Sequence, residues 1–295
     1  MSNTHLAVVA ASVLLVACGA PAPQVGTAPS VVTTVFPLSW MAQQIAPEAA
    51  LTFLGAGGHD PHDVELGTQD RVALEQADVV AHVGPVAFQP QVEDALGDRT
   101  DGVVSILDVL GEGAFLAARD DDRLDPHIWF APALMADVAA ALGEALAAAD
   151  AEAAAGYRER ARAVDAQLRA LNVELDQILS DCEHDEAVVS HEAYAYLLVP
   201  RGLDQHGVAG VDPEGGASPA ALAELADRIR AEGITAVLAE PIEGRADAEA
   251  LAREADVALL DIDPLESVTP EQAARGYPAL LREQAQTFAT ALDCR

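Results

Sequence analysis

Short apolar runs alternate with amphipathic stretches along most of this 295-residue chain, and this alternation limits the folds open to it. Such runs, separated by helical patterns, are typical of parallel sheets with helices on both faces. The predicted strands are Val31–Phe36, Leu51–Leu54, Val79–Val83, Val103–Leu107, Ala187–Ser190, Gly207–Val211, Thr235–Ala239 and Val257–Ile262. The helical patterns include Gln69–Gln76, Pro132–Ala149, Pro219–Glu232 and Ala246–Ala255. With four strands in each half, we expect an α/β fold of two lobes.

One long helix is predicted between the two lobes. Residues 151–180 contain no proline and only one glycine, and Val164, Leu168, Leu171 and Leu175 recur at helical spacing. A helix of this length spans about 40 Å, which favours a rigid connection over a flexible linker. We therefore predict an N-terminal lobe over 31–150, a linking helix over 151–181 and a C-terminal lobe over 182–295.

The charge of the chain excludes several classes of partner. Its 48 acidic residues outnumber 16 basic ones, all arginine, and the formal net charge is −32. Nucleic-acid binding and a polybasic contact with membranes are excluded, because both depend on clustered cations. The hydrophobic fraction of 51% excludes a disordered acidic protein. The remaining partners are cations, small molecules and other proteins.

Three histidines and one aspartate stand where predicted strands end or helices begin. They are His62 in a Gly-rich loop, His127 before a helical pattern, His191 directly after a strand, and Asp263 after the last strand. Open α/β sheets bind ligands at the carboxyl ends of their strands. Three imidazoles and one carboxylate suit Zn²⁺ and can accept Mn²⁺. A single such histidine is more often a surface or capping residue, but the shared setting of all four favours a divalent-metal site.

The segments that carry these residues resemble the metal-binding solute-binding proteins of bacterial ABC importers for zinc and manganese. The matching segments, in order, are the Gly-rich loop that ends in Asp60-Pro61-His62, then Asp125–Trp129, Ser190–Leu197, Glu240-Pro241 and Asp263-Pro264-Leu265. The resemblance extends from Val31 to the C-terminus. It implies two α/β lobes joined by one long helix, with the metal in the cleft between them.

Carried over position by position, the resemblance implies His62, His127, His191 and Asp263 as the metal ligands. Manganese-binding members often have Glu at the third position, so His191 favours Zn²⁺ over Mn²⁺. The implied function is capture of Zn²⁺ outside the cytoplasmic membrane and its delivery to an ABC permease, without enzymatic activity. We expect the protein to act as a monomer.

The sequence departs from the family pattern in two places. Many zinc-binding members carry a long His-rich loop before the second ligand, whereas Arg119–Asp125 is short and contains an Asp run that is typical of a solvated turn. A metallochaperone that loads the site in its place is an open alternative. Val64 stands where the family usually has an aromatic residue. His59, Glu65 and Glu240 are expected to support the ligands from outside, and His82, His184 and His206 are expected not to bind metal.

The N-terminus and the cysteines indicate export. The apolar run Leu6–Ala17 has the length of a signal-peptide core, too short to span a membrane, and it ends in a lipobox-like sequence around Cys18. We predict a signal peptide over 1–18, lipidation of Cys18 and a flexible tether over 19–30. The exported protein is then either held by a lipid to the outer face of the cytoplasmic membrane or periplasmic. Cys182 and Cys294 remain as an even pair in an oxidising compartment, which favours a disulfide.

Two other function classes compete with metal capture. A zinc hydrolase would use three histidine ligands and an open position for a reactive water, with Asp263 or Glu65 as general base. The chain contains neither a His-Glu-x-x-His nor a Gly-x-Ser-x-Gly motif to support this class. The third class is an adhesion or structural lipoprotein in which the metal only stabilises the fold.

Overall fold

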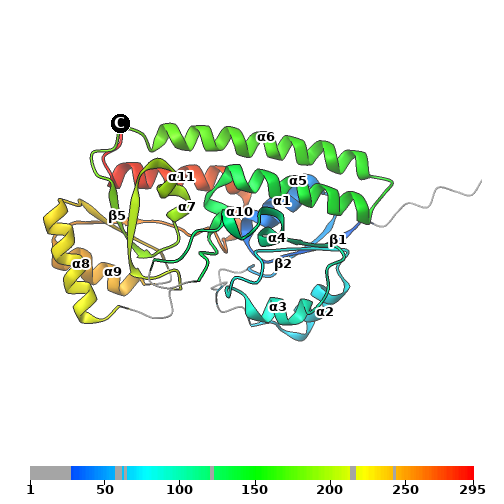
Figure 1. Cartoon of the computed structure of the whole chain (residues 1–295), viewed down its shortest axis with the longest axis horizontal. Helices are drawn as coiled ribbons and strands as arrows, with labels where there is room; N and C mark the ends of the chain where they lie inside the picture. Colours follow the sequence, from blue (N-terminus) through cyan, green and yellow to red (C-terminus); the bar gives the residue numbers. More distant parts are fainter. Residues whose placement is uncertain (1–27, 57–61, 63–64, 120–122, 213–216, 242–243) are drawn as a thin grey trace, which may run out of the picture.

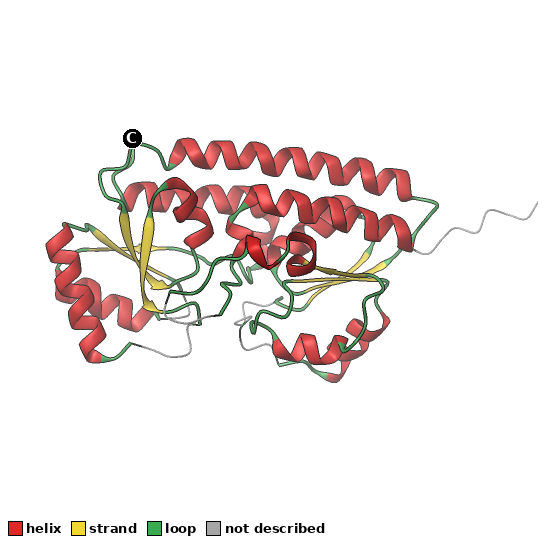
Figure 2. Cartoon of the chain, viewed as in Figure 1, coloured by secondary structure: helices red, strands yellow, loops and turns green. Residues whose placement is uncertain are grey.

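Two four-stranded parallel sheets form the framework of the computed structural model, which describes residues 28–56, 62, 65–119, 123–212, 217–241 and 244–295. Each sheet has helices on both faces and forms one lobe (Figures 1 and 2). The predicted α/β fold of two lobes is therefore confirmed. The signal peptide, Cys18 and most of the predicted tether lie outside the described residues.

The two sheets have the same strand order. The first is ordered β2-β1-β3-β4 and the second β6-β5-β7-β8. The strands are β1 Ser30–Thr33, β2 Ala50–Phe53, β3 Val79–His82, β4 Val103–Ser105, β5 Glu186–His191, β6 Asp204–Ala209, β7 Ala236–Ala239 and β8 Ala258–Asp261. In the register, Val31 pairs with Leu51 and Val79, and Val188 pairs with His206 and Val237. Each strand predicted from the apolar runs overlaps one of these.

The helices cover the sheets and join the lobes. They are α1 Phe36–Ile45, α2 Thr68–Gln76, α3 Pro90–Leu96, α4 Ile106–Leu110, α5 Pro132–Ala149, α6 Ala154–Ile178, α7 Ala195–Leu198, α8 Pro219–Glu232, α9 Arg245–Ala255, α10 Pro270–Arg275 and α11 Tyr277–Ala291, with 3-10 turns η1 Glu112–Ala114, η2 Ile128–Phe130 and η3 Val199–Arg201. By length and composition α5 could cross a membrane, but half of it is buried and it packs against α6 and β4. It is a core helix of the N-terminal lobe.

Helix α6 is the predicted long helix, and it runs along both lobes (Figure 1). Its 25 residues extend about 38 Å. Near its start, Arg160 pairs with Glu48 at 3.0 Å. Towards its end, Asp176 pairs with the buried side chain of Arg201 at 2.7 Å. Leu168, midway between these ion pairs, is completely buried. The helix is therefore bound to each lobe by both ion pairs and apolar packing.

Helix α11 also contacts both lobes. At its start, the hydroxyl of Tyr277 donates a hydrogen bond to the carbonyl of Trp129 in the N-terminal lobe. Near its end, the ring of Phe288 lies 5.2 Å from that of Tyr194 in the C-terminal lobe, measured between centroids. One continuous cluster of buried apolar side chains extends from Val31 to Leu292 through both lobes. The two sheets therefore share a core.

The predicted disulfide is confirmed. Cys182, between α6 and β5, is bonded to Cys294 beside the C-terminus, 112 positions away. The backbone N–H groups of Glu183 and His184 both donate to the carbonyl of Leu292, at 3.1 Å each. The bond thus joins the end of the linking helix to the segment that follows α11.

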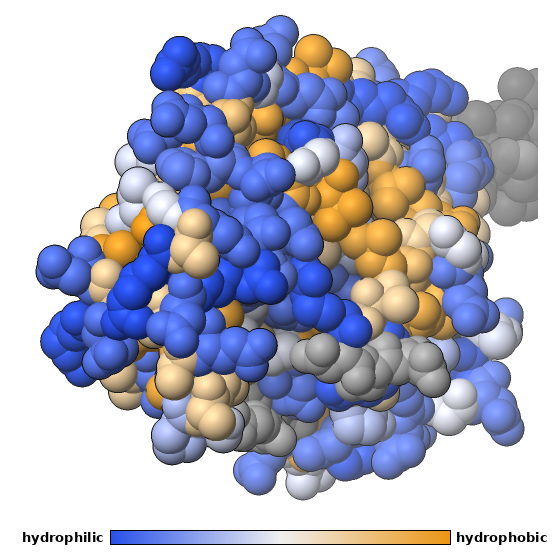
Figure 3. Space-filling model, turned by 60° about the vertical axis from the view of Figure 1, so that its left-hand side comes forward, coloured by the Kyte–Doolittle hydropathy of each residue, from blue (hydrophilic) through white to orange (hydrophobic). Residues whose placement is uncertain are grey.

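The surface of the molecule is largely polar on the face seen in Figure 3, where hydrophilic side chains cover much of the area beside a hydrophobic one.

Candidate metal centre

Four side chains that could hold a metal ion meet between the lobes. His62 and His127 come from the N-terminal lobe, and His191 and Glu266 come from the C-terminal lobe. One potential ligand atom from each residue lies within 4.8 Å of all the others. His62 follows β2, His127 directly precedes η2, His191 is the last residue of β5, and Glu266 follows β8. Three of the four residues thus lie at or after the end of a strand.

The spacing of these atoms suits a small tetrahedral cation. His127 Nε2 lies 2.9 Å from Glu266 Oε1 and 3.2 Å from His191 Nε2. His62 Nε2 lies 3.3 Å from the same Glu266 oxygen. Two ligands bound to tetrahedral Zn²⁺ at about 2.1 Å stand about 3.4 Å apart. The donor atoms are therefore gathered to nearly the separation that zinc requires, with three nitrogens and one oxygen.

An aspartate beside His127 fixes the orientation of its ring. Asp125 Oδ1 lies 2.7 Å from His127 Nδ1 and accepts the backbone N–H of His127 at 2.9 Å. This contact directs Nε2 towards the other three residues. Burial by itself would lower the pKa of His127, but the carboxylates of Asp125 and Glu266 outweigh it and raise this pKa to about 10.

A glutamate plays the same part for His191. Glu240 Oε1 and Oε2 lie 2.8 and 2.9 Å from His191 Nδ1, so Nε2 faces the metal centre. The hydroxyl of Tyr194 donates to Glu240 Oε1 at 2.8 Å, and the backbone N–H of Glu240 donates to the hydroxyl of Ser190 at 3.1 Å. The carboxylate is buried among these partners. Glu240, expected from the sequence to support the ligands from outside, thus contacts His191 and is not a member of the group of four.

The fourth member of the group is Glu266, and not Asp263 as the sequence predicts. The Asp263 carboxylate accepts the backbone N–H of Leu265 at 2.8 Å and the side-chain N–H of Gln272 at 2.6 Å. It therefore stabilises the turn after β8. Leu265 has a left-handed backbone with φ of 60°, and this turn brings Glu266 to the histidines. Trp129 Nε1 holds the turn by donating to the carbonyl of Pro264 at 2.8 Å.

The charge of Glu266 is maintained in a fully buried position. Burial alone would raise the pKa of Glu266, but the imidazoles of His62 and His127 outweigh it and hold this pKa well below its usual range. In contrast, burial raises the pKa of Asp263, and the nearby carboxylates of Glu240 and Glu266 raise it further. The imidazoles therefore favour the ionised form of Glu266, which is the form in which a carboxylate binds a metal.

The remaining residues singled out in the sequence lie elsewhere. Glu65 is exposed, and His59, Val64 and the Asp run at 120–122 lie outside the described residues. His82, His184 and His206, which the sequence predicts not to bind metal, pair with Glu93, Asp293 and Glu186, respectively. The sequence places Asp125 in an Asp-Pro-His triplet but does not indicate that it orients the ring of His127.

Access to the centre is narrow on the side of His62. The ring of Phe88 packs edge-on against the His62 ring with centroids 4.6 Å apart. A cavity of 20 Å³ beside His62 is large enough for about one water molecule. At its rim, Arg123 of the N-terminal lobe pairs with Asp212 of the C-terminal lobe at 3.4 Å. Among the described residues, this pair and the ring of Phe88 therefore narrow the way to the centre on this side.

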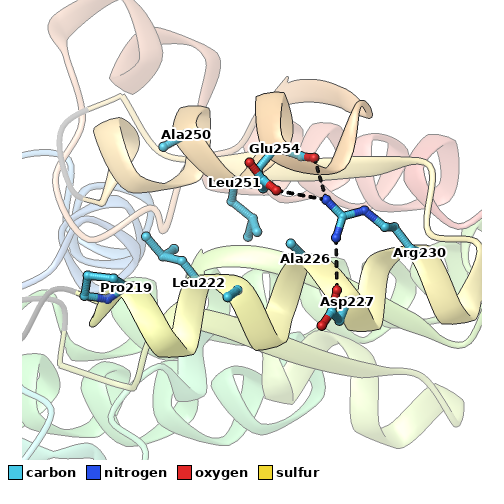
Figure 4. A pocket seen from close by; sticks show the side chains of 9 residues that line it. Pro219, Leu222, Ala226, Asp227, Arg230, Ala250, Leu251 and Glu254 are labelled. Atoms are coloured by element: carbon cyan, nitrogen blue, oxygen red, sulfur yellow. Dashed lines mark hydrogen bonds and ion pairs between the residues drawn. The ribbon is translucent and has the colours of Figure 1, made fainter.

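A second hollow lies on the C-terminal lobe between α8 and α9 (Figure 4). Its volume is 410 Å³, and apolar side chains such as Leu222 and Leu251 line it. Arg230 crosses one end and pairs with Asp227 at 3.0 Å and Glu254 at 3.1 Å. None of the four metal-centre residues lines this hollow, so it is separate from the site.

Comparison with known proteins places the chain among zinc-uptake proteins. Residues 31–291 match the model of the family described as zinc-uptake complex component A, periplasmic. The zinc-binding protein AdcA of Streptococcus pyogenes is 25% identical over 288 residues, which are 89% of this chain and 56% of AdcA. The high-affinity zinc uptake system protein ZnuA of Bacillus subtilis is 25% identical over 291 residues, 92% of this chain and 91% of that protein. The chain thus spans about half the length of its AdcA relatives.

Solved structures show the same fold. A crystal structure of ZnuA is 24% identical with a TM-score of 0.77, and the match covers 90% of this chain and 99% of that one. The periplasmic zinc-binding protein TroA of Treponema pallidum is 22% identical with a TM-score of 0.81, at the same coverage. The match to the family model extends over most of the chain. The chain therefore belongs to the family of the periplasmic component A of zinc-uptake complexes.

Proposed function

We propose that this protein binds Zn²⁺ outside the cytoplasm and delivers it to the permease of an ABC importer. The observation that carries the proposal is the group of three imidazoles and one carboxylate gathered between the lobes. Membership of the zinc-uptake family and the names of the relatives AdcA and ZnuA support it.

In this proposal the ligands are His62, His127, His191 and Glu266. Three nitrogen donors make a softer site than two histidines with two carboxylates, and this favours Zn²⁺ over Mn²⁺. Asp125 and Glu240 keep two of the rings in place, so these rings need not reorient when the ion binds. Zinc is the transported ligand and is not retained for chemistry.

A pair of matched variants tests the ligand set. Calorimetric titration of the metal-free protein should give one tight Zn²⁺ site per chain, and a stoichiometry of zero would refute the proposal. Glu266→Gln removes the negative oxygen donor but keeps the shape of the side chain, so we expect at least a hundredfold loss of affinity. Asp263→Asn is the control and should stay within about tenfold of the wild type, as expected for a residue outside the ligand group. If Asp263→Asn instead loses more affinity than Glu266→Gln, Asp263 and not Glu266 is the fourth ligand.

The same geometry argues against a hydrolase. Four protein ligands complete the tetrahedral coordination of Zn²⁺, whereas a catalytic zinc keeps one position for a reactive water. We therefore propose that the protein is not an enzyme. Turnover of ester, phosphate or peptide substrates that is lost in His127→Ala would contradict this.

Attachment to the membrane is the final part of the proposal. Family membership indicates a location outside the cytoplasm, and a relative from Streptococcus pneumoniae is named a zinc-binding lipoprotein. We propose that Cys18 carries the lipid and that the protein works as a monomer, loaded either directly or by a metallochaperone. Mass spectrometry of the exported protein tests the lipid, because Cys18→Ser should remove the acyl mass.

A further inference from the structure

Arg119 extends from the N-terminal lobe to three acceptors on the C-terminal lobe. Its Nε lies 3.2 Å from Glu192 Oε1, and its Nη2 lies 2.6 Å from Asp204 Oδ1. The same Nη2 donates to the carbonyl of Gln205 at 2.6 Å. We call this set of contacts the Arg119 clamp. A guanidinium suits this role because its N–H donors are held in a rigid planar arrangement, so that separate nitrogens face different acceptors.

The acceptors of the clamp belong to the elements that position His191. Glu192 follows His191 directly, its side chain is 8% exposed, and its Oε1 also accepts the backbone N–H of Gly207. The side-chain oxygen of Gln205 accepts the backbone N–H of Tyr194, whose hydroxyl in turn holds Glu240. The clamp therefore contacts both the segment that follows β5 and the first residues of β6.

On the other lobe, the clamp is connected to His127. The residues before Arg119 pair with residues that follow it in the chain: Ala118 N–H donates to the carbonyl of Arg123, and Asp125 N–H donates to that of Leu116. Asp125 fixes the His127 ring. The hydroxyl of Tyr196 joins this segment to the C-terminal lobe, since it donates to the carbonyl of Asp125 and accepts Leu116 N–H.

We propose that Arg119 is a positioning residue that slows the release of zinc by holding the lobes together. The inference rests on the proposed zinc-binding function. Because the ligands come from both lobes and His127 and His191 are buried, the ion leaves only after the lobes separate. Separation must first break the Arg119 clamp. Capture begins from separated lobes, in which the clamp is not yet formed, so the clamp acts on release and not on capture.

The expected effect is moderate. The Arg119 side chain is 39% exposed, so solvent weakens each of its ion pairs. Its contacts to two carboxylates and one carbonyl nevertheless stabilise the joined lobes together. The Arg123–Asp212 pair and Tyr196 still join the lobes when Arg119 is replaced. We therefore expect the rate constant of zinc dissociation to rise about fivefold in Arg119→Met, and the association rate constant to change by less than about twofold.

Stopped-flow release from the zinc-loaded full chain into excess chromophoric chelator measures the dissociation rate constant. Arg230→Met is the matched control, because Arg230 is 46% exposed and joins α8 to α9 within one lobe (Figure 4). It should leave zinc release unchanged. Raising the salt concentration should speed release from the wild type and have a smaller effect on Arg119→Met, since salt screens the pairs that this variant lacks.

Two further variants separate the clamp from a general loss of stability. Asp204→Asn should speed release in the wild type but add little to Arg119→Met, because both changes break the same contact. Arg119→Lys keeps the positive charge but loses the planar guanidinium. Its rate constant of zinc dissociation should lie between those of Arg119→Met and the wild type. If Arg119→Met folds poorly, Arg119→Lys and Asp204→Asn carry the test.

The inference is overturned if Arg119→Met binds one zinc per chain and releases it at the wild-type rate. It is equally overturned if Arg230→Met speeds release as much. A wild-type protein that binds no zinc would instead refute the proposed function, so the two failures are distinguishable.

Discussion

Reduction of the Cys182–Cys294 disulfide is a quantitative test of what stabilises this fold. The bond closes a loop of 112 positions, which contains the whole C-terminal lobe. Its neighbours Glu183 and His184 keep their backbone hydrogen bonds to Leu292 when the bond is broken. We therefore expect the reduced protein to keep its native structure. The loss of stability should arise in the unfolded chain, which gains conformational freedom.

The size of the loss follows from the length of the loop. For 112 residues, the chain-entropy relation gives a change of about 16 cal/mol/K, or about 4.8 kcal/mol at 25 °C. At about 2 °C per kcal/mol for a chain of this size, the midpoint of thermal unfolding should fall by about 10 °C. The apolar core continues through both lobes, so a single transition is expected.

Calorimetry or circular dichroism of the metal-free protein, with and without reductant, measures this shift. Cys182→Ser/Cys294→Ser is the control and should unfold at the lower temperature in both conditions. The zinc stoichiometry should be the same in all samples. A difference of less than about 2 °C between the oxidised and reduced protein would refute the reasoning, because the unfolded chain would then gain little freedom from loss of the bond.

Three further perturbations address other parts of the molecule. Glu240→Gln should weaken zinc binding about 10- to 100-fold by calorimetry, because the carboxylate that orients His191 is lost. Leu168→Ala, in the buried face of α6, should lower the free energy of unfolding in urea by about 2–5 kcal/mol. Hydrogen bonds from Ser30 lower the pKa of Asp78, so its contribution to stability is present above about pH 4 and lost as the pH falls. The midpoint difference between the wild type and Asp78→Asn should accordingly shrink in acid.

The sequence was informative about the fold because the fold depends on periodic patterns. Apolar runs predicted every described strand within a few residues, and the apolar stripe of Val164, Leu168, Leu171 and Leu175 predicted α6. The contribution of α11 was not predicted. Its contacts to both lobes depend on Tyr277 and Phe288 meeting distant aromatic side chains, and a local pattern does not indicate such partners.

The sequence predicts the three histidines of the metal centre but not its carboxylate, because only the histidines are placed by the ends of regular elements. His62, His127 and His191 meet as expected, because each is placed by a strand end or by a helix start. The choice between Asp263 and Glu266 depends on the left-handed backbone of Leu265, which periodicity does not reveal. One available signal was the presence of a second carboxylate in the same loop, on a longer side chain that could extend further.

The even division of the ligand group between the lobes has a thermodynamic consequence. Of the four donors found among the described residues, each lobe contributes two, and the second pair acts at an effective concentration that α6 and α11 set by limiting how far the lobes can move apart. A partner that moves the lobes apart by a small distance would leave the ion bound by two ligands instead of four. The affinity of the protein for the ion would then fall, and the partner could accept the ion without binding it more tightly than the closed protein does.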